Sequence, residues 1–161
     1  MKAIKVFKFI ASLAVCFGTS GIGAVFMADD SISTWYAGLV RPSITPPDWV
    51  FGPVWTILYL LMGISVFIVW NKGLDYPKVK QALVLFLIQL FLNAAWTPLF
   101  FGLHLILAAL IEIVLLWLAI LATFLAFNRI SARAGMLLLP YLIWVGYAVI
   151  LNGSIWYLNR Q

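Results

Sequence analysis

The chain has 161 residues, of which 65% are hydrophobic and only 9% are charged, and its formal net charge is +5. A soluble domain usually carries about 25% charged residues, so this composition excludes a soluble globule as well as a disordered chain. One cysteine and one histidine exclude a disulfide framework and a multi-histidine metal site, and five acidic residues leave little for acid–base catalysis. The sequence therefore predicts an integral membrane protein without a metal site or a required cofactor.

Five apolar runs have the length of about 20 residues with which a helix crosses a bilayer. They cover residues 6–28, 46–71, 81–102, 104–127 and 134–157. Only Gly102 and His104 can form a turn between the third and fourth runs, which predicts a tight hairpin there. Barrel strands would alternate polar and apolar residues, so the runs indicate an all-α bundle of five transmembrane helices in one domain, residues 1–161.

The first run resembles a signal peptide, because three lysines precede it. Its apolar stretch continues to Ala28 and no A-x-A cleavage site precedes Asp29, so we expect a retained helix. Basic residues then fix the orientation, since loops rich in Lys and Arg stay in the cytoplasm. Two basic residues, Arg41 and Arg160, fall on one side, and eight fall on the other. The count predicts a cytoplasmic N terminus and an external C terminus.

Residues 29–45 form a long external connection between the first and second spans. Loops of this length are usually functional or disordered, and Trp35 and Tyr36 disfavour disorder. Two interpretations stay open, namely an aromatic belt at the membrane surface and a lid over a cavity. The motif TPPD at 45–48 predicts a capping box, with Thr45 capping a second helix that begins at the next residue.

Polar and aromatic side chains recur at one depth inside the spans. At 1.5 Å per residue, Trp55, Asn93, Glu112 and Ala148 lie about 12 to 14 Å from the external ends of their helices. A carboxyl group inside a bilayer is costly, so Glu112 is expected to face the bundle interior with a partner or to carry a proton. The pattern fits a ligand cavity open to the outside, and it equally fits hydrogen bonds that hold helices together.

Several motifs together resemble the translocator protein family, also called tryptophan-rich sensory proteins or peripheral-type benzodiazepine receptors. They are WYAGLVRPSITPPDWVFGPVWTILY at 35–59, NAAWTPLFFG at 93–102, Glu112, and LPYLIWVGYAVILN at 139–152. The resemblance covers essentially the whole chain. It implies a membrane receptor or transporter that binds protoporphyrin IX, haem and related hydrophobic ligands beneath the first loop, in tetrapyrrole sensing, transport or turnover. Sterols, benzodiazepine-type compounds, membrane lipids and a second copy of the chain in a homodimer are further implied partners.

The resemblance also implies which side chains line the pocket. They come from the loop and four spans: Tyr36, Trp55, Tyr59, Asn93, Trp96, Glu112, Trp144, Ala148 and Leu151. A porphyrin is a large flat ring on which tryptophans stack, and its propionates would face Arg41. Some family members are reported to degrade porphyrin in light with two pocket tryptophans, which correspond to Trp55 and Trp144. Whether the chain is an enzyme is therefore left open.

Two other functions compete with this interpretation. A proton-coupled small multidrug transporter would exchange drug for protons at Glu112, and a ligand-free membrane scaffold would need no cavity. Neither explains the signature at 35–59. The sterol motif of animal members is matched only loosely, by Leu151, Tyr157 and Arg160. Nucleic-acid binding is not expected, because the ten Lys and Arg residues are scattered along the chain.

Overall fold

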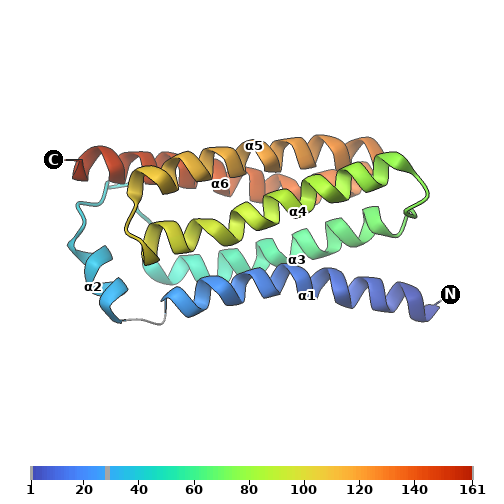
Figure 1. Cartoon of the computed structure of the whole chain (residues 1–161), viewed down its shortest axis with the longest axis horizontal. Helices are drawn as coiled ribbons and strands as arrows, with labels where there is room; N and C mark the ends of the chain where they lie inside the picture. The colour runs from blue at the N-terminus through green and yellow to red at the C-terminus, as the bar shows by residue number, and fades with distance from the viewer. Residues whose placement is uncertain (1, 28–29, 161) are drawn as a thin grey trace.

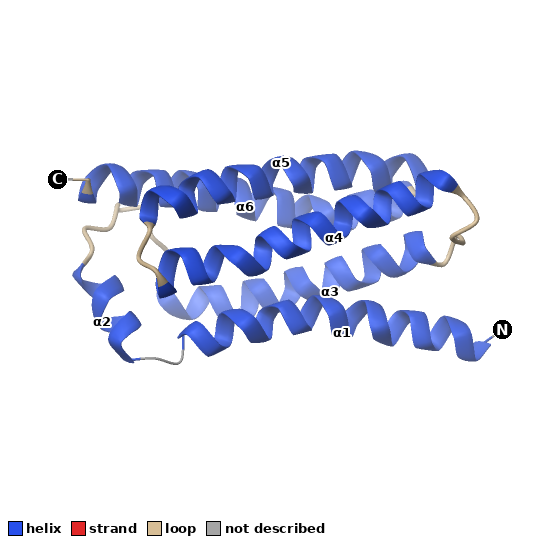
Figure 2. Ribbon diagram, in the orientation of Figure 1, coloured by secondary structure: helices blue, strands red, loops and turns tan. Residues whose placement is uncertain are grey.

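The computed structural model describes the backbone of residues 2–27 and 30–160 and the side chains of residues 2–21 and 34–160. Positions 28 and 29, where the predicted first span ends and the predicted connection begins, lie outside the described residues. In chain order the elements are α1 (Lys2–Met27), α2 (Asp30–Gly38), the 3-10 turn η1 (Asp48–Val50), α3 (Phe51–Trp70), α4 (Pro77–Thr97), the π-helical turn η2 (Pro98–Gly102), α5 (Ile106–Ile130) and α6 (Ala132–Asn159). All are helical, which confirms the all-α prediction (Figure 1; Figure 2).

The long helices run side by side along one axis (Figure 1). Within the described residues, five of them are long and apolar enough to cross a membrane: α1, α3 with η1, α4 with η2, α5 and α6. The N and C termini lie at opposite ends of the bundle, as an odd number of crossings requires. The most extensive contact joins α5 to α6, followed by α4 to α5 and α1 to α3.

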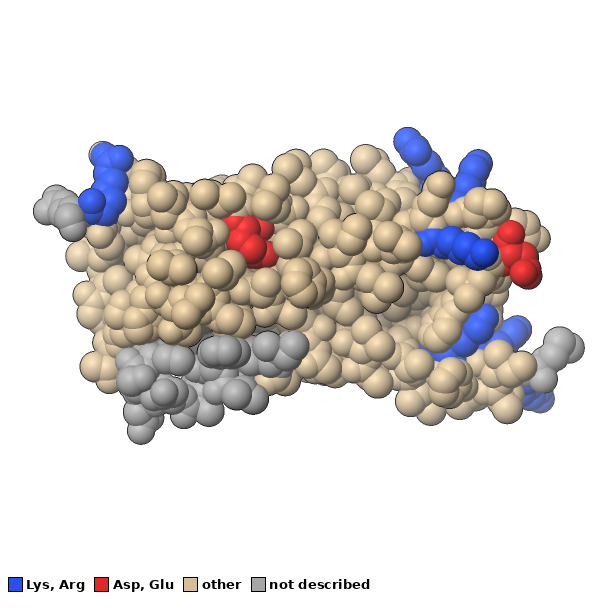
Figure 3. Space-filling model, in the orientation of Figure 1, with Lys and Arg blue, Asp and Glu red and all other residues tan. Residues whose placement is uncertain are grey.

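The two ends of the bundle differ in their charge. Lys and Arg gather near the end that carries the N terminus, and few charges lie on the face in between (Figure 3). We call this the basic end. We call the opposite end the loop end, because it carries α2, the connection from α4 to α5 and the C terminus. At the basic end, Lys8 lies 5.5 Å from the ring centre of Trp70 and its Nζ donates to the Trp70 carbonyl at 3.3 Å, which ties α1 to α3.

Helix α3 begins later than the sequence pattern predicts, and the prediction of a capping box at 45–48 is wrong. The hydroxyl and the N–H of Thr45 both donate to the Pro42 carbonyl, at 2.8 and 3.0 Å, and close a turn instead. A residue that precedes a proline is disfavoured in the helical region, and this applies to Thr45 and to Pro46. Helical structure therefore starts at Asp48, after the second proline, in η1.

The tight hairpin predicted between the third and fourth spans is confirmed. Residues 103–105 join η2 to α5, and His104 adopts a left-handed conformation with φ of 57°. Histidine is one of the residues that occupy this region more often than most side chains do. The Leu103 N–H donates to the Pro98 carbonyl at 2.9 Å, which closes the wide π-helical turn before the hairpin.

The basic end is held by close contact between helix backbones. Ser65 of α3 donates its hydroxyl to the Ala134 carbonyl of α6 at 2.7 Å. Gly135 lies so close to α5 that an added Cβ would be 2.7 Å from the Cβ of Asn128 and 2.9 Å from its Cα. Small residues of this kind allow membrane helices to approach closely, which is one way to gain packing energy without a hydrophobic driving force.

Candidate functional site

A chain of hydrogen bonds crosses the middle of the bundle and joins three helices. Tyr59 of α3 donates its hydroxyl to Asn93 Oδ1 of α4 at 2.8 Å, and Asn93 Nδ2 donates to the hydroxyl of Tyr141 in α6 at 2.9 Å. All three side chains are buried. The bonds place Tyr59 at the depth of Asn93, whereas counting residues from the helix ends predicts that depth for Trp55, one turn nearer the loop end. A buried chain of hydrogen bonds of this kind helps to fix how the three helices face one another.

Tryptophans cover this network on the side of the loop end. Trp55 stacks on Tyr59, with ring centres 5.4 Å apart and planes at 29°, and meets Tyr141 edge to face at 6.2 Å. Trp144 of α6 meets Phe51 edge to face at 5.8 Å. Both tryptophans are half-buried, so each presents part of its ring for further contact.

A second aromatic cluster lies at the loop end, with Phe100 of η2 at its centre. Trp96 stacks on Phe100 at 5.1 Å and 19°, while Trp35 and Tyr36 of α2 meet Phe100 edge to face at 5.6 and 6.2 Å. Leu151 is buried in the same cluster. The α2 segment is therefore docked onto the π-helical turn by its two aromatic rings.

Trp96 is also fixed by a hydrogen bond at the edge of this cluster. With the Asn152 amide oriented so that its oxygen faces the indole, Trp96 Nε1 donates to Asn152 at 3.2 Å. The amide nitrogen of Asn152 then donates to the Ile106 carbonyl at 3.2 Å. The contact joins α4, α5 and α6 at the base of the docked segment, and Ala148 lies one turn of α6 below it, half-buried against the main core.

Polar contacts fasten the rest of the connection to the bundle. Asn159 of α6 accepts from the Val40 N–H at 3.0 Å and donates to the Val40 carbonyl at 2.9 Å. Tyr147 donates its hydroxyl to the carbonyl of Ile44. Trp35 stacks on His104 with ring centres 4.0 Å apart. The connection from α1 to α3 therefore lies over the loop end and is attached at three separate places.

We call residues 30–47 of this connection the covering segment. Arg41 brings positive charge to it. Its guanidinium lies 5.3 Å from the ring centre of Tyr36 and 3.6 Å from a carboxylate oxygen of Asp48. Burial raises the pKa of the Tyr36 phenol, and the positive charge of Arg41 partly offsets that effect. The Arg41 side chain is 37% exposed and that of Asp48 is 77% exposed, so the pair contributes little to stability and leaves the guanidinium accessible to an anionic group.

Glu112 of α5 is buried, as expected, but the expected hydrogen-bond partner is not found in the described part of the chain, and the alternative that it carries a proton stays a prediction. Neither carboxyl oxygen has a partner among the residues that the structure describes. Gln89 of α4 is in the same state, with both side-chain amide atoms buried and unbonded. The Ser12 hydroxyl of α1 is also buried and unbonded, and an unpartnered buried polar group costs roughly 1 to 3 kcal/mol.

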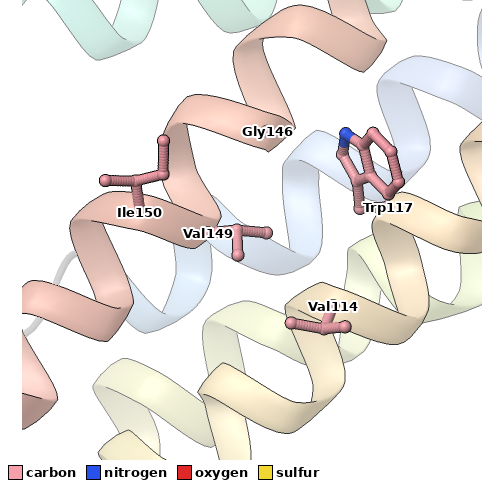
Figure 4. Close-up of a pocket in the computed structure, with 5 residues that line it drawn as sticks. All are labelled: Val114, Trp117, Gly146, Val149 and Ile150. Carbon is pink, nitrogen blue, oxygen red and sulfur yellow. The ribbon is translucent and has the colours of Figure 1, made fainter.

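Aromatic rings of the predicted pocket pack on other rings of the protein, Trp55 on Tyr59 and Trp96 on Phe100. Two hollows are resolved elsewhere on the described surface. One, of about 300 Å³, lies over the seam of α5 and α6 and is lined by Val114, Trp117, Gly146, Val149 and Ile150 (Figure 4). Trp117 crosses this seam and donates its indole N–H to the Leu142 carbonyl at 3.1 Å. The other, of about 510 Å³, lies at the loop end beside His104 and Arg160.

Sequence reasoning missed three residues that organise the site. Tyr141 completes the hydrogen-bond chain, Phe100 centres the loop-end cluster, and Asn159 holds the covering segment. Tyr141 precedes Trp144 and Ala148 by three and seven residues, so the stripe on α6 was a usable signal for it. Phe100 carries no such signal, since it is one apolar residue in an apolar run. No group of three His, Cys, Asp or Glu within the described part of the chain could hold a metal ion.

The fold and the site together define a polytopic helical membrane protein whose loop end carries an aromatic cluster beneath a docked connection. Residues 11–158 match the sequence model of the TspO/MBR family. The chain is 45% identical over 155 residues to the tryptophan-rich protein TspO of Chlorobaculum tepidum, covering 94% of this chain and 98% of that one. The chain belongs to the TspO/MBR family, and it is an integral multi-pass membrane protein.

Relatives with other names are found in distant organisms. The human translocator protein is 40% identical over 136 residues, which cover 84% of this chain and 80% of the human one. A tryptophan-rich sensory protein of Cereibacter sphaeroides is 37% identical over 151 residues, which cover 94% of this chain and 90% of that one. The resemblance seen in the sequence motifs is thereby confirmed over nearly the full length.

Proposed function

We propose that the chain binds flat hydrophobic tetrapyrroles, such as protoporphyrin IX or haem, beneath the connection between α1 and α3. The relatives' names, translocator protein and tryptophan-rich sensory protein, support a membrane role of the sensory or transport type. Binding would serve tetrapyrrole sensing, transport or turnover. The ligand site would be formed by Tyr36, Trp55, Tyr59, Asn93, Trp96, Glu112, Trp144, Ala148 and Leu151.

The observation that carries this proposal is the convergence of aromatic rings under one fastened segment. Trp55, Trp96 and Trp144 come from three different helices, and each lies half-buried on the loop side of the buried Tyr59–Asn93–Tyr141 network. Aromatic pairs contribute about 0.5 to 1.5 kcal/mol beyond their buried area, so several rings can hold one macrocycle. Each of these three tryptophans packs on another aromatic ring of the protein, so a ligand enters when the covering segment lifts and takes Tyr36 with it. Arg41 then meets the propionates.

Protoporphyrin IX titrated into purified protein is expected to quench tryptophan fluorescence and to bind with a defined stoichiometry. Replacing Trp55 or Trp144 with Phe removes part of a stacking surface and should weaken binding about five-fold, from a loss of about 1 kcal/mol. If the protein degrades the porphyrin in light with these two rings, both variants should also slow its consumption. Fluorescence titration and absorbance under illumination measure the two effects.

Two further tryptophans serve as matched controls. Trp49 is 75% exposed in η1, and Trp70 lies at the basic end of α3. Trp49→Phe and Trp70→Phe should leave the affinity unchanged. If protoporphyrin IX quenches the tryptophan fluorescence of all four variants with the same apparent affinity, the porphyrin is partitioning into detergent and the site does not exist.

Glu112 supports a second candidate function, proton-coupled transport of a hydrophobic cation. A buried carboxyl group without a partner is the feature that such transporters use to exchange a substrate for a proton. Reconstituted vesicles with a pH gradient would then show substrate flux that Glu112→Gln abolishes. Unchanged flux in Glu112→Gln, or porphyrin binding without flux, would favour the first proposal instead.

We further propose a cytoplasmic N terminus, an external C terminus and a homodimeric assembly in a bacterial cell membrane. Eight basic residues at or near the basic end support the orientation. Cysteines placed after Lys72 and after Arg41 should react with a membrane-impermeant reagent from opposite sides. Labelling of the Arg41 position from the cytoplasmic side would reverse the assignment.

A further inference from the structure

The hollow of about 510 Å³ at the loop end lies outside the proposed tetrapyrrole site. Its apolar wall comes from the first turns of α5, including Leu107 and Ile111. Its polar wall comes from His104 in the hairpin and from Asn159 and Arg160 at the end of α6. The hollow therefore has one apolar side that continues along a membrane-spanning helix and one polar side at the end of the bundle.

The polar wall carries the positive charge of Arg160. Among the described side chains, the ion pair joins Arg41 to Asp48, and no acidic side chain pairs with Arg160. Arg160 is exposed and lies 4.2 Å from the ring centre of Tyr157, which holds the guanidinium beside an amphipathic ring. The first turn of α5 contains no acidic residue, so the positive end of that helix adds to the field of Arg160, and the C-terminal end of α6 partly offsets it. The wall is suited to an anion.

The apolar wall is suited to a hydrocarbon chain. Leu107 is 48% exposed and Ile111 is 57% exposed, one turn further along α5. Aromatic residues such as Trp156 and Tyr157 are typical of the boundary between hydrocarbon and headgroups, and both lie in the last turn of α6. An occupant of this hollow therefore meets the charged wall at headgroup level and the apolar wall within the bilayer.

We propose that this hollow binds an anionic glycerophospholipid, with its phosphate at Arg160 and one acyl chain along Leu107 and Ile111. A zwitterionic lipid carries a compensating cation beside the phosphate and gains less from this wall. A sterol has no charge and leaves the guanidinium without a counter-ion. The proposal is independent of tetrapyrrole binding, because Arg160, Leu107 and Ile111 contribute nothing to that site.

The test uses the full chain purified in a neutral detergent and titrated with short-chain phosphatidylglycerol. Native mass spectrometry counts the bound lipid, and the rise in melting temperature measures its binding. Arg160→Gln removes the charge and should weaken binding about ten-fold. Arg133→Gln, at the other end of the same helix, should leave the affinity unchanged. Equal losses in the two variants would show general attraction to a basic protein and would overturn the site.

Three further measurements keep the test decisive. Ala108→Trp fills the hollow without changing its charge and should also prevent binding, provided that the melting temperature without lipid is unchanged. If Ala108→Trp does not fold, Leu107→Asp replaces it in the test. A carboxylate in the apolar wall should weaken binding, because the acyl chain would have to pack against a charged group. Phosphatidylcholine should bind at least several-fold more weakly, and equal binding would overturn the preference for an anion. Inorganic phosphate should not displace the lipid, since displacement would make free phosphate the ligand.

Discussion

The basic end and the loop end of the bundle are packed by different kinds of side chain. At the basic end, Ser65 bonds directly to the backbone of α6, and Gly135 brings α6 against α5. At the loop end, large rings such as Trp35, Trp96 and Phe100 fill the space between elements. The hydrogen-bond chain through Asn93 lies between the two.

This difference in packing indicates which end of the bundle can change shape. Contact between backbones leaves no room for rearrangement, because interiors that are closely packed respond to added volume with strain. Rings that stack on one another can exchange a protein ring for a ligand ring of the same chemistry at little net cost. The loop end is thus the end suited to a large flat ligand, while the basic end holds the helices in register.

The largest effect is expected at the backbone contact of the basic end. Gly135→Ala places a Cβ within 3 Å of both the Cα and the Cβ of Asn128, so the helices must shift. The variant should lose about 2 to 3 kcal/mol of unfolding free energy, measured by denaturant titration in micelles. Gly18→Ala is the control, because no atom lies within 4 Å of the added methyl group. Equal stability of the two variants would contradict the close contact of α5 and α6.

A smaller effect is expected at the boundary between the two ends. Asn93→Leu keeps most of the volume but leaves the hydroxyls of Tyr59 and Tyr141 without their partner. The loss should be about 1 to 2 kcal/mol, since membrane hydrogen bonds contribute modestly each. A double variant with Tyr59→Phe should lose less than the sum of the two single losses. Strict additivity would show that the two side chains do not interact.

The smallest effect on global stability is expected at the loop end. Asn159→Ala removes both hydrogen bonds to Val40, so residues 39–50 should exchange their amide hydrogens faster. The melting temperature should change little, because the helices keep their packing. Ser154→Ala is the matched control, since the Ser154 hydroxyl bonds only to Ile150 in its own helix. Faster exchange throughout α6 would instead mean that Asn159 stabilises the whole bundle.

The fold was largely predictable, because crossing a bilayer sets a minimum length for each apolar run. The predicted helix boundaries were wrong where prolines or charged residues set the start of a helix, as in η1 and α4. Helix α4 begins at Pro77, four residues before the predicted span, because its charged first turn extends beyond the apolar core. Helix α2 was not predicted, since a short helix at the membrane surface has no such length requirement.

The candidate site was predictable in depth to about one helical turn but not in contacts. Counting residues from helix ends put Trp55 at the height of Asn93, and the hydrogen bond to Asn93 comes instead from Tyr59, one turn further along α3. Counting does not give the rotation of each helix about its axis, which is set by packing against neighbours. For that reason the sequence did not show that Glu112 lacks a partner while Asn93 has two. The role of Phe100 depends on the π-helical turn, which apolar patterning does not reveal.

Asn159 takes part in two features of the loop end. It lines the hollow of about 510 Å³, and its side chain is hydrogen-bonded to Val40 of the covering segment. His104 has the same double position, because it lines the hollow and stacks on Trp35. Any occupant that engages these two side chains changes the free energy of opening the segment, and by thermodynamic reciprocity an open segment changes the affinity of the hollow. A lipid bound in the hollow would then act as an effector and would adjust the affinity of the proposed tetrapyrrole site without touching it.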